Sequence, residues 1–195
     1  LTYLIEDGEY SNTLDIQAAD IAKHLRSQLV GPHISGIVAL QRDVESDLRY
    51  NVIDFFDKRS ESKRRVIAIR GSRSLQNLRD AGDTALEPDA NLDGLRVHKG
   101  FRKVCNLILD DYFALLRRDT RFRAAAEEAE LIVTGHSLGG AAAVLVGANP
   151  MRRGFHVARV TVFGCPRVTD SQGAQRLFAP PTAEAEADAE AEAAE

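Results

Sequence analysis

LIVTGHSLGG, residues 131–140, decides the fold, because an apolar run leads into a Gly-x-Ser-x-Gly pentapeptide and then into small residues. The apolar residues 131–134 predict a buried strand, and residues 137–148 predict a helix that is apolar nearly all round. A serine that lies in such a pentapeptide, between a strand and a helix, is typical of a nucleophile elbow.

The two glycines of the pentapeptide have a steric reason to be there. A turn this tight leaves no room for a side chain at Gly135 or Gly139, and it strains the serine between them. The bend would lift the hydroxyl of Ser137 above the sheet, and the N–H of Leu138, at the helix N-terminus, would face a developing oxyanion. We therefore expect Ser137 to be a nucleophile and the Leu138 amide to be one oxyanion donor.

Apolar runs on either side of the pentapeptide predict the rest of an α/β domain. Strands are predicted over residues 35–41, 52–56, 65–70, 131–134 and 157–163, and amphipathic helices over residues 14–29 and 100–118. The order strand, helix, strand over residues 131–163 indicates a right-handed parallel crossover.

Three blocks of sequence resemble the class 3 lipase family, the fungal triacylglycerol lipase type. They are IAIRGSRSLQNL (residues 67–78), VHKGF (residues 97–101), and the pentapeptide followed by TVFGCPRV (residues 161–168). Their order and spacing agree with that family over roughly residues 35–170. The resemblance implies an α/β-hydrolase fold, with a mostly parallel central sheet and helices on both faces.

The resemblance also implies further site residues. Ser72 would supply the second oxyanion contact through its backbone amide and hydroxyl, and residues 73–83 would form a lid, with Leu78 where the family has a tryptophan. His136, inside the pentapeptide, and His98 would support the site without acting as its base. The implied substrate is a lipid ester at a lipid–water interface, and no residue pattern indicates a cofactor or a metal.

The rest of a catalytic triad is not found. In α/β-hydrolases the serine is followed along the chain by an acid and then by a histidine. After Ser137 the one histidine is His156, which is expected on the surface, and beyond it lie only Asp170 and the acids of the tail. We do not expect Asp170 to be the triad acid, so the triad Asp and His stay unassigned. We expect a domain truncated near residues 170–178 and feeble activity of the isolated chain.

Charge is distributed unevenly along the chain. The formal net charge is −4, and residues 181–195 hold six acids and no base, so the remainder carries a net charge of +2. Such a body lacks the basic face that nucleic acids require, and the apolar stretches are too short to span a bilayer. The alternation of alanine with acids predicts a disordered tail over residues 179–195, after one incomplete domain over residues 1–178.

Several features receive a structural interpretation. The two cysteines, Cys105 and Cys165, have no metal-ligand spacing and are expected to be buried thiols. The triplet KRR at residues 63–65 is expected in a solvated loop, and Asp80 and Asp83 are expected to be solvent-facing or capping carboxylates rather than a metal pair. The chain starts at Leu1 without a signal-peptide pattern, and this start resembles a fragment boundary, so localisation and oligomeric state stay open.

Two functional classes follow from the sequence. The first is a carboxylic-ester hydrolase that acts on lipid esters through an acyl-enzyme at Ser137. The second is a catalytically inactive relic or fragment of an esterase that serves as a lipid- or protein-binding domain. Within the enzymes, a soluble-ester hydrolase or an acyltransferase is a further alternative to a lipase.

Overall fold

The computed structural model of the chain describes residues 33–45, 48–71, 85–151 and 157–178. The strands are β1 (Ile34–Glu45), β2 (Leu48–Asp57), β3 (Ser62–Ile69), β4 (Leu86–Asp89), β5 (Leu95–His98), β6 (Ala129–His136) and β7 (Val157–Phe163). The helices are η2 (Ala90–Leu92, a 3-10 helix), α4 (Lys99–Arg118), α5 (Thr120–Glu127), α6 (Leu138–Met151) and α7 (Ser171–Phe178). The strands and helices predicted within these residues are confirmed, whereas the helix predicted over residues 14–29 lies outside them.

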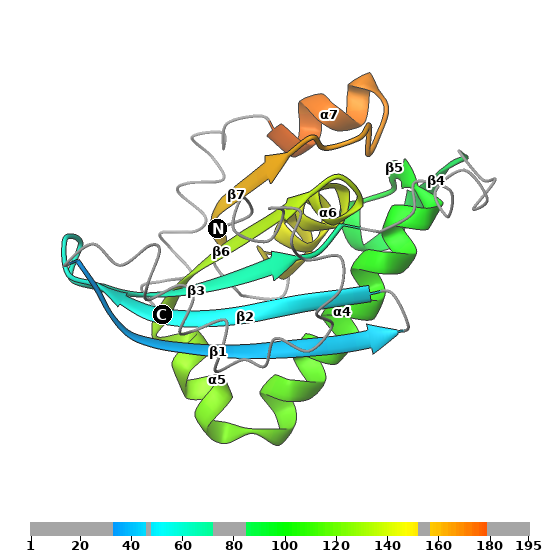
Figure 1. Cartoon of the computed structure of the whole chain (residues 1–195). Helices are drawn as coiled ribbons and strands as arrows, with labels where there is room; N and C mark the ends of the chain where they lie inside the picture. Colours follow the sequence, from blue (N-terminus) through cyan, green and yellow to red (C-terminus); the bar gives the residue numbers. More distant parts are fainter. Residues whose placement is uncertain (1–32, 46–47, 72–84, 152–156, 179–195) are drawn as a thin grey trace, which may run out of the picture.

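The main sheet has five strands in the order β1-β2-β3-β6-β7 (Figure 1). β3, β6 and β7 run parallel, which confirms the predicted crossover through α6. β1 and β2, and β2 and β3, pair antiparallel, as is common for strands that follow each other closely along the chain. The sheet is therefore mixed, with its parallel half on the side of β6. β4 and β5 form a separate antiparallel pair.

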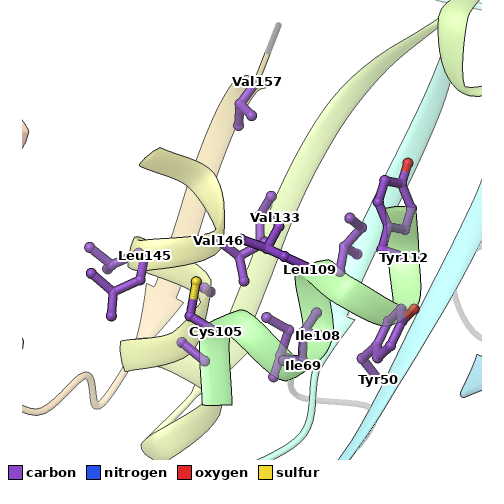
Figure 2. Close-up of a cluster of buried hydrophobic side chains, with 14 of the residues drawn as sticks. Tyr50, Ile69, Cys105, Ile108, Leu109, Tyr112, Val133, Leu145, Val146 and Val157 are labelled. Atoms are coloured by element: carbon purple, nitrogen blue, oxygen red, sulfur yellow. The ribbon is translucent and has the colours of Figure 1, made fainter. Parts of the chain in front are cut away.

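The main core lies between one face of the sheet and helices α4 and α6. Leu109 from α4, Val133 from β6 and Val146 from α6 meet there, as Figure 2 shows. α6 is buried along most of its length because its alanines and valines let it pack on the sheet and on α4 together. A smaller cluster occupies the opposite face, because alternate side chains of a strand point to opposite sides; it comprises Ile37, Ile53, Val66 and Ala68.

Arg65 corrects the expectation of a solvated loop at residues 63–65, because these residues belong to β3. Its side chain is 1% exposed and bonds both carboxylate oxygens of Asp54, at 2.6 and 2.7 Å. It also donates to the hydroxyl of Tyr112 and stacks over the ring of Phe122 at 4.1 Å. Burial alone would lower the pKa of Arg65, but the hydrogen bonds and charge of Asp54 hold that pKa above its usual range. A charged pair thus fastens β2 and β3 to α4 and α5.

A second charged cluster fastens α4 to the outer strands. Arg42 of β1 donates to both oxygens of Asp111, at 2.9 and 2.7 Å, and the hydroxyl of Tyr50 donates to the same carboxylate at 2.8 Å. The hydrogen bonds from Arg42 are the main cause that lowers the pKa of Asp111. Burial, together with the hydrogen bond to Asp111, raises the pKa of Tyr50.

The two cysteines form no disulfide. Cys105 is fully buried between α4 and α6, as expected, and Cys165 is half-buried after β7. Burial raises the pKa of the Cys165 thiol, so it is less often ionised than an exposed cysteine.

Candidate active site

Ser137 occupies the bend between β6 and α6. Its backbone has a φ of 52°, in the left-handed region that residues with a side chain rarely adopt. The N–H of Ser137 donates to the carbonyl of Phe163, the last residue of β7, at 3.0 Å. The carbonyl of Ser137 accepts from Ala141 in the first turn of α6, also at 3.0 Å. The serine backbone is therefore held from both sides in a strained conformation.

The glycines around the serine are required by close approach of backbone atoms. A Cβ at Gly135 would lie 2.2 Å from the carbonyl oxygen of Gly139. A Cβ at Gly139 would lie 2.3 Å from the carbonyl oxygen of Ile69, at the end of β3. Both distances are far inside van der Waals contact, and both partners are backbone atoms that cannot rotate away. The backbone of the bend therefore packs directly against the backbone at the end of β3.

One of the two candidate oxyanion donors, Leu138, lies within the described residues. Leu138 is the first residue of α6, and the first amides of a helix have no acceptor within it. Ser72 lies outside the described residues, as do residues 73–83. The residue before it, Gly71, lies against the bend: a Cβ there would be 3.7 Å from the Cβ of Ser137. Gly71, which follows β3 by two residues, therefore lies beside Ser137.

Two histidines near this edge are engaged with neighbouring backbone and rings. His98 caps α4, since its Nδ1 accepts from the amide of Gly100 at 3.1 Å, and its ring stacks on Phe101 with centroids 4.2 Å apart. The ring of His136 is half-buried and lies beside Gly164, where an added Cβ would come 3.1 Å from Nε2. These contacts suit supporting roles for both residues.

Asp170 caps a helix. Its Oδ1 accepts from the amide of Gly173 at 2.8 Å, in the first turn of α7. This gives a physical reason for the expectation that Asp170 is not the triad acid, because the carboxylate is used locally. His156 lies outside the described residues, as do Asp80 and Asp83.

Within the described ranges, no three His, Cys, Asp or Glu side chains gather as metal ligands would. No helix in that same part of the chain combines the length and the apolarity needed to cross a membrane.

The sequence interpretation missed a groove on the solvent side of α4. The groove has a volume of about 480 Å³ and is lined by Lys99, Gly100, Arg102, Lys103, Asn106, Leu107 and Asp110. Its signal in the sequence is the spacing of the three cations, which are three and four residues apart and therefore share one side of a helix. Sequence alone does not show that they line a concave surface.

Comparison with known proteins identifies the family. Residues 66–180, more than half of the chain, match the family described as Lipase (class 3). The secreted mono- and diacylglycerol lipase A of Penicillium cyclopium is 32% identical over 115 residues, which cover 58% of this chain and 36% of that protein. The secreted mono- and diacylglycerol lipase MDL3 of Malassezia globosa is 33% identical over 120 residues, which cover 56% of this chain and 38% of that protein.

The fold is similar to that of a solved lipase. The structure of a lipase from Rhizopus microsporus var. chinensis matches with a TM-score of 0.55 at 22% identity, over 80% of this chain and 52% of that one. This likeness shows the mixed-sheet α/β fold. The chain spans little more than a third of the length of the two curated relatives. The sequence match over residues 66–180, on a fold that fungal lipases share, shows that the chain belongs to the class 3 lipase family.

Proposed function

We propose that this chain carries the nucleophile of a lipid-ester hydrolase, and that Ser137 is that nucleophile. The observation that supports this most directly is the left-handed backbone of Ser137 at the bend between β6 and α6. Holding a residue in such a conformation costs about 1–3 kcal/mol, and strain of this kind concentrates at functional sites. Membership of the class 3 lipase family supports the same reaction class.

The reaction proceeds through an acyl-enzyme. Ser137 Oγ attacks the carbonyl carbon of the ester, its proton passes to a base, and the bond to the alcohol breaks as the alcohol takes up a proton. Water then attacks the acyl-enzyme, which releases the carboxylic acid and restores the serine hydroxyl. The N–H of Leu138 and the amide and hydroxyl of Ser72 stabilise the oxyanion in both steps. We assign the base and its orienting acid to no residue of this chain.

The proposed substrate is an ester of an acylglycerol presented at a lipid–water interface. The curated relatives are named as mono- and diacylglycerol lipases, and this supports the substrate class. Turnover on one ester measured below and above its micelle concentration tests the interface dependence. Equal turnover per site in the two states would instead indicate a soluble-ester hydrolase.

A fluorophosphonate probe tests the nucleophile. We expect labelling of the chain to be lost in Ser137→Ala and retained in Ser171→Ala, a matched change at the exposed first residue of α7. In a chain without its base, labelling is slow, because the oxyanion donors and binding alone supply about 10³ to 10⁴-fold acceleration over water. Labelling that persists unchanged in Ser137→Ala would overturn the assignment.

A non-catalytic binding domain is the second candidate. It is favoured by the engagement of Asp170 and His98 as helix caps, since neither is then available as a triad member. A folded chain that the probe leaves unlabelled but that still binds lipid vesicles would support this candidate over the hydrolase.

A further inference from the structure

Two neighbouring strands end in the same unusual way beside the candidate nucleophile. β6 and β7 run parallel (Figure 1), and their last paired residues are His136 and Phe163. The residue that follows each strand, Ser137 after β6 and Gly164 after β7, has a φ of 52°. Both chains therefore leave the sheet through a left-handed residue at the same level. Gly164 adopts this conformation without the clash that a Cβ causes, whereas Ser137 does not.

A hydrogen bond between these two strand ends holds the strained serine. Ser137 makes one backbone hydrogen bond with Ala141, which lies in the first turn of α6. Its other backbone hydrogen bond runs from its N–H to the carbonyl of Phe163, at 3.0 Å, and reaches a different strand. A left-handed serine is less stable than the same residue at a negative φ, so contacts with the rest of the fold must hold it there. The carbonyl of Phe163 is such a contact.

The direction of that carbonyl depends on Gly164. The C=O of Phe163 belongs to the planar peptide group that ends at the Cα of Gly164, so the φ of Gly164 sets the angle between this plane and the chain that follows. The following chain is anchored, because the carbonyl of Val168 accepts from the N–H of His98 at 2.9 Å. A change of φ at Gly164 would therefore turn the Phe163 carbonyl away from Ser137.

The space around this peptide group is limited on two sides. A Cβ added at Gly140 of α6 would lie 3.3 Å from the carbonyl oxygen of Phe163. A Cβ added at Gly164 would lie 3.1 Å from Nε2 of His136, the residue before the nucleophile. Gly164 itself is exposed, so core packing gives no reason for a glycine there. The reasons that the structure gives are its left-handed φ and the ring of His136.

We propose that Gly164 is a positioning residue for Ser137. Its left-handed backbone keeps the Phe163 carbonyl on the Ser137 amide, and this hydrogen bond keeps the nucleophile and the adjacent N–H of Leu138 in the strained bend. A side chain at residue 164 favours a negative φ, which turns the carbonyl and lets Ser137 relax. The inference deepens the proposed function and rests on it for the effect on reactivity, whereas the effect on the backbone of Ser137 needs no reaction.

Amide hydrogen exchange, resolved by residue with NMR spectroscopy, tests the geometry in the full chain. Gly164→Ala should raise the exchange rate of the Ser137 N–H about tenfold relative to amides at the centre of β6, the order of effect expected for one lost hydrogen bond. Gly164→Asn should raise it less, because asparagine tolerates a left-handed backbone better than alanine does. Both variants place a Cβ at the same position beside His136. Equal increases would therefore trace the effect to that ring and overturn the role of the left-handed backbone.

Gly94→Ala is the matched control. Gly94 is exposed, has a φ of 72° and lies directly before β5, outside the main sheet. Among the described residues, a Cβ added there would meet no atom within 4 Å. This variant carries the same kind of backbone strain, so it should lower the urea midpoint as Gly164→Ala does, yet leave the relative exchange of the Ser137 N–H unchanged. If the two variants raised that exchange equally, or if Gly164→Ala left it unchanged, Gly164 would be an ordinary turn residue and the proposal would fail.

The rate of fluorophosphonate labelling measures the effect on the nucleophile. At a temperature where both variants are folded, Gly164→Ala should slow labelling about tenfold, because reactivity depends on the geometry of the serine and its oxyanion donors. Gly94→Ala should label at the rate of the parent chain. Faster exchange at Ser137 with unchanged labelling would overturn Gly164 as a positioning residue. A parent chain that the probe leaves unlabelled would instead overturn the nucleophile, and amide exchange would still decide whether Gly164 holds the bend.

Discussion

The bend at Ser137 and the charged contacts of Arg65 hold the same sheet together by different means. At the bend, backbone atoms of Gly135, Gly139 and β3 approach one another without intervening side chains. At Arg65, a long side chain forms an ion pair with Asp54 of β2 and a hydrogen bond with the carbonyl of Phe122 in α5. Steric contacts of backbone tolerate no added atom, whereas charged contacts weaken by degrees and respond to pH. We therefore expect a substitution at the bend to cause a large loss of stability at once, and a change in the charged contacts to lower stability gradually.

The largest effect is expected from Gly139→Ala. The added methyl would lie 2.3 Å from the carbonyl oxygen of Ile69 and 2.8 Å from the carbonyl carbon of Arg70, so β3 and the bend must separate. We expect a loss of at least about 3 kcal/mol in the free energy of unfolding, at or above the upper range for overpacking. Urea denaturation measures it.

Gly100→Ala is the control for that change. Among the described residues its methyl would meet only the ring of His98, at 3.2 Å, and a side chain can shift. Because alanine also favours a helix more than glycine does, we expect a change within about 1 kcal/mol. Equal losses in the two variants would refute the steric account of the bend.

Arg65→Met is expected to have the next largest effect. It leaves the carboxylate of Asp54 without its partner, and breaking a buried pair costs about 3–5 kcal/mol. The carboxylate of Asp54 stays 27% exposed, so we expect the lower value, about 2–3 kcal/mol. Lys63→Met, which breaks an exposed pair with Glu128, should cost less than about 1 kcal/mol. Adding Asp54→Asn to Arg65→Met should recover part of the loss, and no recovery would argue against an unpaired charge as its cause.

Acid should weaken the Asp111 cluster gradually. The pKa of Asp111 is lower in the folded chain than in the unfolded one, mainly because of Arg42. The stability that Asp111 contributes is therefore present above about pH 4, its unfolded pKa, and is lost as pH falls through the folded pKa. The free energy of unfolding, measured by urea denaturation from neutral pH to below pH 4, should fall for the parent chain and should fall less, by about 1–2 kcal/mol, for Asp111→Asn. If the free energy of unfolding depended on pH equally in the parent chain and in Asp111→Asn, Asp111 would not be the cause of the acid sensitivity.

Tyr50 sets the alkaline limit of the same cluster. Its pKa is raised in the fold, so its contribution to stability is complete below about pH 10 and declines as pH rises beyond that value. Tyr50→Phe should reduce this alkaline dependence while keeping the ring in the core, and the remainder comes from Tyr112, whose pKa is also raised by burial. A parent chain whose urea midpoint does not change above pH 10 would contradict this prediction.

The smallest effect concerns the strain itself. Glycine adopts a φ of 52° without the clash that a Cβ causes, and that clash is worth about 1–2 kcal/mol. We expect Ser137→Gly to be about 1 kcal/mol more stable than Ser137→Ala in thermal and urea unfolding. Both variants lack the hydroxyl, so a difference in stability reports the backbone alone. Equal stability would show that the bend stores no strain at this position.

The sequence predicted what local pattern determines. The pentapeptide and its apolar neighbours predicted β6, the bend and α6, because the position of a strand, a tight turn and a helix within twenty residues depends on neighbouring residues. Short apolar runs likewise predicted β1 and β3, though both strands are longer in the structure. The family resemblance implied a mostly parallel sheet, whereas the sheet is mixed, because β2 pairs antiparallel with both β1 and β3.

The burial of Arg65 could not be predicted in the same way. Its partners Asp54, Tyr112 and Phe122 are 11, 47 and 57 residues away in the chain. A basic triplet has the same appearance whether distant residues cover it or water does. The groove on α4 was missed for a related reason. The spacing of its cations is visible in the sequence, but Glu87, which pairs with Lys99 and Arg102, comes from strand β4.

The hydrogen bond from Ser137 to the end of β7 limits the chemistry that can follow. Its amide already donates to Phe163, so the serine cannot lend its own N–H to the negative oxygen that forms when the hydroxyl attacks. In the proposed mechanism, donors that follow Ser137 along the chain, or that follow β3, would bind that oxygen. Because the carbonyl of Phe163 occupies the Ser137 amide, Leu138 and its neighbours are the proposed donors. A ligand that mimics the tetrahedral intermediate should therefore bind on the side of these amides.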